Sequence, residues 1–292
     1  MSPTTTAFVL SGGGSLGAVQ VGMLQALDAH GIHPDLLVGI SAGAVNALWV
    51  AEHGMSAGSL ARLASIWEGL RRKDVFPVTA AHLLQGLVGR RQALCDSDQL
   101  GSLVRTHCGV GDLAETSIPV HLVATDLLSG KDVMVSSGPP DQAVRASAAI
   151  PGVFAPVLVD GRWLVDGALA AHAGVAQAVQ LGATEVYVLP AGVPCALADP
   201  PRSALGVTTL ALTFLIEQRL ISEVMDPPPG AAIRLVPPLC PVSVSAADFS
   251  HGAELIGRAR RASLRWLERG GPELPEPARF LSLHHHLTEP RR

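Results

Sequence analysis

The chain has 292 residues, of which 48% are hydrophobic and only 16% are charged, and its mean hydropathy is +0.34. That length allows one large α/β domain or two small ones. The net charge of -4 gives no electrostatic basis for binding nucleic acid. No N-terminal segment joins a basic start to a long apolar run, so we expect no signal peptide and a cytoplasmic protein. The cysteines are far apart and lack C-x-x-C spacing, which is typical of reduced core thiols: Cys95, Cys108, Cys195 and Cys240.

The beginning of the chain alternates strand and helix signals. Ala7–Leu10 is a compact apolar strand that runs directly into a glycine-rich loop, Ser11–Gly17. A helix with apolar residues at helical spacing follows and ends at Gly31, after which Leu36–Ile40 forms a second strand. This order favours parallel strands joined by right-handed crossovers.

The second strand leads into Gly39-Ile40-Ser41-Ala42-Gly43, which has the pattern G-x-S-x-G between a strand and a helix. That context is the one a nucleophile elbow requires. The sharp turn explains both glycines and directs Ser41 Oγ to the helix N-terminus, where partial positive charge favours a developing anion. The same pentapeptide also fits a tight turn in which Ser41 is only the helix N-cap, so both interpretations stay open here.

The glycine loop admits three interpretations. Gly12, Gly14 and Gly17 fit G-x-G-x-x-G, the dinucleotide fingerprint, but Asp35 lies before the second strand instead of after it. No Gly-Lys-Ser/Thr follows, which excludes a nucleotide P-loop. We favour an oxyanion hole made of bare backbone amides, placed beside the elbow by two adjacent parallel strands. A plain tight turn is the remaining alternative.

The rest of the chain continues the α/β pattern. Two hairpins are expected, one from Val120–Thr125 to Val133–Val135 and one around the Asp160-Gly161 turn that ends on Asp166. Asp126 and Asp132 are interpreted as turn residues. The other expected elements are an amphipathic helix Ser59–Leu70, an apolar segment His82–Val88 followed by Arg90-Arg91, a helix capped within Asp96-Ser97-Asp98 that runs to His107, a short helix Asp141–Ala149, a helix Val175–Leu181, a strand Glu185–Leu189, a long apolar helix Ala204–Val224 packed on the sheet, a strand Ala232–Val236 and a basic amphipathic helix His251–Arg269.

A serine nucleophile needs a group that takes its proton. His172 and His251 are the histidines that could complete a triad, because His284–His286 lie in the tail. However, Ser41 follows only the second strand, which argues against the α/β-hydrolase fold. Asp166 ends a strand and could accept the proton directly, although an Asp-Gly pair also commonly caps a turn.

Together these motifs resemble the patatin-like phospholipase family, in its bacterial branch. The resemblance covers about residues 7–190 and includes the segments Ala124–Gly130 and Ala143–Phe154. The motifs that carry it are Gly12-Gly13-Gly14-Ser15-Leu16-Gly17, Gly39-Ile40-Ser41-Ala42-Gly43 and Asp166-Gly167-Ala168.

The resemblance implies a three-layer α/β/α fold with a mainly parallel central sheet. It implies a carboxylic ester hydrolase that acts on lipids, as a phospholipase A, lysophospholipase or lipid esterase. Ser41 is then the nucleophile and Asp166 the base, with no histidine, metal or other cofactor, and the lipid substrate implies transient contact with a membrane surface. The implied oxyanion residues are Gly12, Gly13, Gly14 and Ser15, with motif support from Gly17, Gly39, Gly43 and Gly167.

The sequence departs from the family pattern in two places. Leu16 stands where the family usually has Arg or Lys, and His172-Ala173-Gly174 stands where Asn-x-Pro is frequent. The first removes a positive charge expected near the anion site, which leaves the headgroup preference open. A non-enzymatic lipid- or protein-binding relative is therefore the alternative function. We expect a short lead over 1–6, one domain over 7–269 with its motif core at 7–190, and a Pro-rich, flexible tail over 270–292.

Overall fold

A computed structural model describes residues 4–77, 93–170, 174–202 and 204–273. The predictions for His82–Val88, Arg90-Arg91, His172-Ala173 and His284–His286 lie outside the described residues. The expected domain boundaries stay predictions. None of the helices in the described ranges is long and apolar enough to span a membrane.

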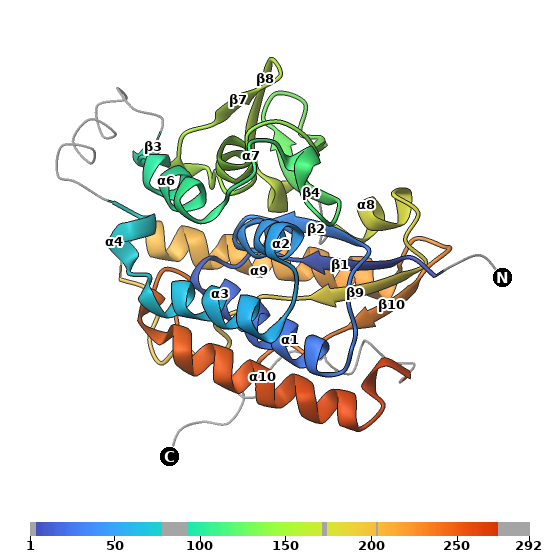
Figure 1. Ribbon diagram of the computed structural model, residues 1–292. Coiled ribbons are helices and arrows are strands. Elements are labelled where there is room, and N and C mark those ends of the chain that lie inside the picture. Colours follow the sequence, from blue (N-terminus) through green and yellow to red (C-terminus); the bar gives the residue numbers. More distant parts are fainter. Residues whose placement is uncertain (1–3, 78–92, 171–173, 203, 274–292) are drawn as a thin grey trace.

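The centre of the molecule is a mainly parallel β-sheet with the strand order β10-β9-β1-β2-β4-β8-β7, and β5 pairs with β4 (Figure 1). The parallel strands form one continuous block, and the hairpin strands run antiparallel at one side of it. The parallel strands are β1 (Thr6–Leu10), β2 (Leu36–Ile40), β4 (Val120–Asp126), β9 (Glu185–Leu189) and β10 (Ala232–Leu235); the antiparallel strands are β5 (Asp132–Val135), β7 (Val157–Val159) and β8 (Arg162–Asp166).

Helices cover both faces of the sheet, as the predicted three-layer fold requires. α9 passes behind the sheet, whereas α1, α3 and α10 lie in front of it (Figure 1). Short 3-10 turns η1 (Gly14–Leu16), η3 (Gly167–Leu169) and η4 (Phe249–His251) precede or follow some of these elements. The α-helices are α1 (Gly17–Ala29), α2 (Ala42–His53), α3 (Ala57–Gly69), α4 (Arg72–Val75), α6 (Asp98–His107), α7 (Pro140–Ser147), α8 (Val175–Gln180), α9 (Ala204–Met225) and α10 (Gly252–Glu268).

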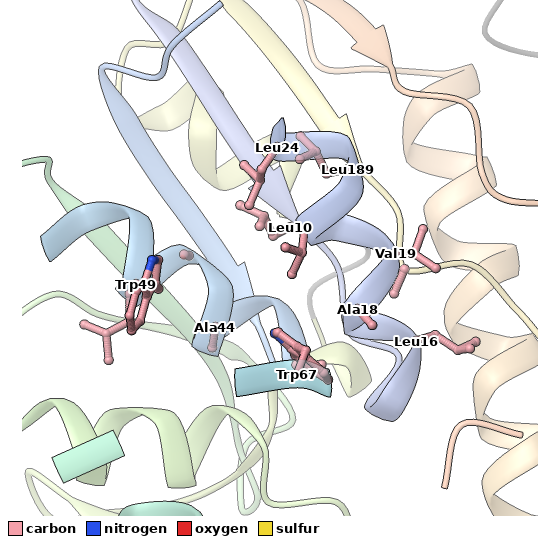
Figure 2. Close-up of a cluster of buried hydrophobic side chains, with 14 of the residues drawn as sticks. Leu10, Leu16, Ala18, Val19, Leu24, Ala44, Trp49, Trp67 and Leu189 are labelled. Atoms are coloured by element: carbon pink, nitrogen blue, oxygen red, sulfur yellow. The ribbon is translucent and has the colours of Figure 1, made fainter. Parts of the chain in front are cut away.

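The alternation of side chains along the strands divides the core into two layers. In β1, Phe8 and Leu10 pack toward α1 and α10, whereas Ala7 and Val9 pack toward α8 and α9. Figure 2 shows Leu10, Leu24 and Leu189 gathered in the first of these layers. Every β1 residue from Ala7 to Leu10 is fully buried, which explains why this strand reads as one continuous apolar run.

The long predicted helix is α9, which packs on the sheet near its C-terminal end and exposes apolar side chains in its middle. Leu220 and Val224 pack into the second core layer, which confirms the expected contact with the sheet. Arg219 donates to the Leu169 carbonyl and ties the helix to the turn after β8. Phe214 and Leu215, in the middle of the helix, are exposed at 45% and 63%.

Two local features differ from the sequence-based expectations. β3 (Ala93–Cys95) and β6 (Gly152–Phe154) form a separate parallel pair, and three-residue strands leave too short a pattern to be predicted. Ser97 precedes α6 as expected, but its side chain does not cap the helix. Its hydroxyl instead accepts a hydrogen bond from Arg145 Nε at 2.9 Å.

Candidate active site

The sheet register brings Ser41 and Asp166 together. Leu122 and Val123 of β4 pair with β2 on one side and with β5 on the other. Ala124 pairs with β5 and with Asp166 of β8, so β8 occupies the row that β2 leaves when the chain turns at Ser41. The last residue of β8 therefore lies next to the first residue after β2.

The elbow holds Ser41 in an unusual backbone conformation. Its φ is 54° and its ψ is -119°, a region that costs a non-glycine residue on the order of 1–3 kcal/mol. A Cβ at Gly43 would lie 2.1 Å from the Leu10 carbonyl oxygen, and one at Gly39 would lie 2.7 Å from Ala44 Cα. Both flanking positions therefore require glycine for close packing, as predicted.

The Ser41 side chain is directed to Asp166 and not to the helix. It makes no capping hydrogen bond to the amides of α2, all of which are described. The Ser41 hydroxyl instead lies close enough to the Asp166 carboxyl to lower its pKa. Ser41 therefore occupies the N-cap position of α2 without capping the helix through its side chain.

Asp166 is a buried carboxylate with few compensating partners. Its Oδ1 accepts a hydrogen bond from the Ala168 amide at 3.0 Å, so the aspartate does cap the turn as well. Burial raises the pKa of Asp166 from 3.8 to about 6, while the hydrogen bonds from Ala168 and Ser41 oppose the rise. A carboxylate with this pKa is ionised at neutral pH and is still basic enough to accept a proton.

The glycine loop passes directly beside the elbow. A Cβ at Gly12 would lie 3.1 Å from Ser41 Cβ, and one at Gly13 would lie 2.4 Å from Ala191 Cβ. Gly14 has a φ of 58°, and a Cβ there would lie 2.4 Å from the Ala246 carbonyl oxygen. The amides of Gly12, Gly13 and Gly14 donate to no acceptor among the described residues. All three glycines line one cavity together with Ser41.

Ser15 differs from its expected role. Its amide donates to the Ala246 carbonyl at 2.8 Å, and its hydroxyl donates to the Ser245 carbonyl at 3.0 Å. Because that amide is already occupied, Ser15 anchors the loop to a neighbouring segment and is not available as an oxyanion donor. Gly17 supports the motif differently, since a Cβ there would lie 2.6 Å from the Trp67 ring.

A buried polar network fixes both ends of the glycine loop, and it was not anticipated from the sequence. Gln20 Nε2 donates to the Ser11 carbonyl at 2.8 Å and to the Leu189 carbonyl at 2.9 Å. Asn46 Nδ2 donates to Gln20 Oε1 at 2.8 Å and to the Gly17 carbonyl at 3.0 Å. Trp67 Nε1 donates to Asn46 Oδ1 at 2.8 Å. The sequence signal that could have indicated this network is the presence of Gln20 and Asn46, two polar side chains within otherwise apolar helices.

Ser147 is a second residue that sequence reasoning missed. It lies at the end of α7 and is fully buried. Its hydroxyl donates to the Val123 carbonyl at 2.7 Å and accepts from the Ser41 amide at 3.0 Å. Ser147 therefore links β4 to the strained turn and holds the Ser41 backbone in place.

Two cavities meet at Ser41. The first is bounded by the glycine loop, Asp166 and the α9 residues Thr209, Leu212, Thr213 and Ile216. The second is apolar and extends between α2, α3 and α6, with Val45 and Leu103 among its lining residues. Its walls carry four aromatic side chains, Trp67, Phe76, Phe154 and Phe249. Rings of adjacent members lie 5.5 to 6.4 Å apart between centroids.

Neither His251 nor Leu16 lines the two cavities that meet at Ser41. His251 is paired with Glu254 at 3.3 Å and with Asp248 at 3.7 Å, and no interaction joins it to Ser41 among the described residues. His121 contacts Ser136 at 2.7 Å. Leu16 is fully buried in the core, so its side chain does not line the cavities described above.

Replacing Ser147 tests the support of the elbow. Ser147→Ala removes the acceptor of the buried Ser41 amide, which is expected to cost about 1–3 kcal/mol of unfolding free energy. Ser65→Ala is a matched control, because Ser65 is exposed and only bonds the Ala61 carbonyl within its own helix. Urea denaturation measures both, and equal losses in the two variants would refute the role of Ser147.

The raised pKa of Asp166 has a consequence for stability. The folded state holds this proton up to about pH 6 and the unfolded state only to about 3.8, so stability falls as pH rises between these values. Asp166→Asn removes this loss and is expected to gain stability over the wild type, by roughly 3 kcal/mol above pH 6 at about 1.4 kcal/mol per pKa unit.

Asp126→Asn serves as the control of opposite sign. The amides of Leu128 and Ser129 lower the pKa of Asp126, so its ionised form favours the folded state. This variant should lose stability relative to the wild type as pH rises. Thermal unfolding of the three proteins between pH 4 and 8 measures the comparison, and parallel curves for Asp166→Asn and wild type would contradict the expectation.

Comparison with known proteins identifies relatives of this chain. An uncharacterized NTE family protein of Mycobacterium tuberculosis is 34% identical over 168 residues, which cover 58% of this chain and 44% of that protein. Lysophospholipase NTE1 of Coccidioides immitis is 25% identical over 194 residues, covering 63% of this chain and 11% of that protein. The chain thus spans less than half the length of these curated relatives.

Two further matches are a solved structure and a family model. The crystal structure of VipD from Legionella pneumophila superposes with a TM-score of 0.47 at 14% identity, covering 91% of this chain and 67% of that one. A family model described as patatin-like phospholipase matches residues 8–179. Because that match spans more than half of the chain, the protein belongs to the patatin-like phospholipase family.

Proposed function

We propose that this protein hydrolyses acyl esters of lipids, with Ser41 as the nucleophile and Asp166 as the base. One observation carries the proposal. The Ser41 hydroxyl, held in a strained turn, lies beside the buried Asp166 carboxyl, whose pKa it lowers, and does not cap its helix. A serine in contact with a base, beside unoccupied amides, is the arrangement that acyl transfer requires.

The geometry supports the following reaction. Asp166 accepts the proton of Ser41 as Oγ attacks the ester carbonyl, and it then returns that proton to the leaving alcohol. The amides of Gly12, Gly13 and Gly14 stabilise the oxyanion, assisted by the positive end of α2. Asp166 then accepts a proton from water as the water oxygen attacks the acyl carbonyl, and it gives that proton to Ser41 Oγ as the carboxylic acid leaves. Each oxyanion donor is typically worth about 3 kcal/mol of barrier.

The apolar cavity beside Ser41 supports a fatty-acyl substrate. It gathers four of the eleven aromatic residues of the chain, which comprise four Trp, one Tyr and six Phe. We propose that the acyl chain lies in this cavity while the alcohol part lies toward α9. The relative from Coccidioides immitis is named a lysophospholipase, and a lipid ester as substrate of this chain agrees with that name. Transient contact with a membrane surface stays a prediction.

Activity measurements test the dyad. Ser41→Ala and Asp166→Asn should each lower p-nitrophenyl ester hydrolysis by about three to four orders of magnitude. Wild-type kcat/KM should rise with pH through about 6, because protonated Asp166 cannot act as the base. Asp126→Asn, which alters an aspartate outside the site, should keep wild-type turnover.

The outcome also separates the enzyme from the alternative, a lipid- or protein-binding relative without catalysis. A fluorophosphonate should label Ser41 in the wild type, and mass spectrometry locates the adduct. A folded wild-type protein that is neither labelled nor active would favour the binding module. Wild-type turnover in either dyad variant would refute the assignment of that residue. A panel of lipids then identifies the headgroup.

Filling the apolar cavity tests the position of the acyl chain. Val45 lines this cavity one helical turn after Ser41, so Val45→Phe should shorten the space for the chain. We expect kcat/KM for dodecanoyl esters to fall at least about tenfold relative to acetyl esters, since each lost methylene contact is worth about 0.8 kcal/mol. Leu158→Phe, on the exposed β7, is the control and should leave the ratio unchanged. An unchanged ratio in Val45→Phe would exclude this path.

A further inference from the structure

Two cysteines that are far apart in the sequence lie in contact in the structure. Cys195 Sγ and Cys240 Sγ are 3.4 Å apart and are not joined in a disulfide. Cys195 follows β9 and Cys240 follows β10, and these strands are adjacent and parallel, so the segments after them run side by side. The sequence analysis expected reduced core thiols; Cys195 is buried as expected, whereas Cys240 is exposed and is not a core residue.

The segment that carries Cys195 supports one side of the glycine loop. Ala191 lies against Gly13, where an added Cβ would be 2.4 Å from Ala191 Cβ. The Ala191 amide also donates to Ser11 Oγ at 3.0 Å. This stretch therefore contacts the loop at two of its first three residues.

The segment that carries Cys240 supports the other side. The Ala246 carbonyl accepts from the Ser15 amide, and the Ser245 carbonyl accepts from the Ser15 hydroxyl. The two segments are joined near the cysteines, because the Val242 amide donates to Cys195 Sγ at 3.2 Å and the Val242 carbonyl accepts from the Ala196 amide at 2.8 Å. The glycine loop is thus held between two segments that meet at the paired sulfurs.

We infer that Cys195 and Cys240 are a reversible oxidation site, and that their disulfide changes the position of the glycine loop. A disulfide has an S–S distance of about 2.05 Å, so bond formation brings the two sulfurs roughly 1.4 Å closer than their present 3.4 Å, and the part of this approach that side-chain rotation does not absorb draws the two segments together. Displacement of a catalytic group by about 1 Å can cost up to a hundredfold in rate. The oxidised protein should therefore hydrolyse esters more slowly than the reduced one; this consequence rests on the proposed function.

The chemistry requires a peroxide as the oxidant. The exposed Cys240 thiolate attacks one peroxide oxygen, the O–O bond breaks, and Cys240 sulfenic acid and water form. Cys195 Sγ then attacks the Cys240 sulfur, and the sulfenic oxygen leaves as water with the Cys195 proton. Two thiols and one hydrogen peroxide give one disulfide and two waters.

The surroundings of Cys240 set the pH at which this reaction runs. Burial and the hydrogen bond with Cys195 raise the pKa of Cys240 to about 12, and the nearby Arg258 guanidinium opposes the rise. Arg258 is also paired with Glu254 at 3.0 Å. Because the thiolate is the reactive form, oxidation should accelerate as pH rises from 7 to 9.

The test uses the full chain, reduced and then treated with hydrogen peroxide at pH 8.5. The remaining thiols are then alkylated. Once the mass of the added alkyl groups is subtracted, the intact mass of the oxidised protein should be 2 Da lower than that of the reduced protein. Digestion should yield a Cys195–Cys240 cross-linked peptide. Cys95→Ser/Cys108→Ser is the matched control and should still form the cross-link. Cys195→Ser and Cys240→Ser should not form it.

Activity is read in parallel on the same samples. The oxidised wild type should lose at least about tenfold in p-nitrophenyl ester turnover, dithiothreitol should restore it, and Cys240→Ser should be insensitive to peroxide. Absence of the cross-linked peptide, with the two cysteines separately over-oxidised, would overturn the site. A cross-link without change in turnover would overturn its effect on the loop. A reduced protein without activity would instead count against the proposed function, while the mass measurement still decides whether the disulfide forms.

Discussion

The close approach of α2 to the end of β1 is the constraint on which the site depends. Gly43 lies so near the Leu10 carbonyl that no side chain fits between them. This contact forces the chain to turn sharply after β2 and leaves Ser41 with a positive φ. The strain is local, whereas the opposing term is the burial of β1, β2 and two helices in one core, so the fold can maintain a conformation that an isolated peptide would abandon.

The position of the glycine loop depends in addition on buried polar side chains that have no access to water. Gln20 and Asn46 are fully buried, and their hydrogen bonds join α1, α2 and α3 to both ends of the glycine loop. Partial loss of such a network is costly because each remaining partner stays unsatisfied in a medium of low polarity. The network therefore favours one position of the loop relative to the elbow, which is the preorganisation that a set of amide donors needs.

Local patterns in the sequence were sufficient for much of the architecture. Ala7–Leu10, Leu36–Ile40 and the Asp160-Gly161 hairpin were predicted because burial and turn chemistry act on neighbouring residues. The contact of Ser41 with Asp166 was anticipated from motifs, although their catalytic roles stay predictions. By contrast, the occupied amide of Ser15, the bridge made by Ser147 and the meeting of Cys195 with Cys240 all join segments far apart in the chain. A single hydroxyl or thiol has no periodicity, so the sequence contains no pattern that reports its partner.

β2 and β8 pair with successive residues on the same side of β4. The proposed contact of Ser41 with Asp166 therefore depends on the number of residues in β8. Side chains alternate across a strand, so inserting or deleting one residue between the Asp160-Gly161 turn and Asp166 would direct the carboxylate to the opposite face of the sheet. Changes elsewhere in the excursion from β4 to β8 alter loops without altering this parity. Insertions in the surface loops would therefore leave the carboxylate in place, whereas the five residues of β8 tolerate no change in number.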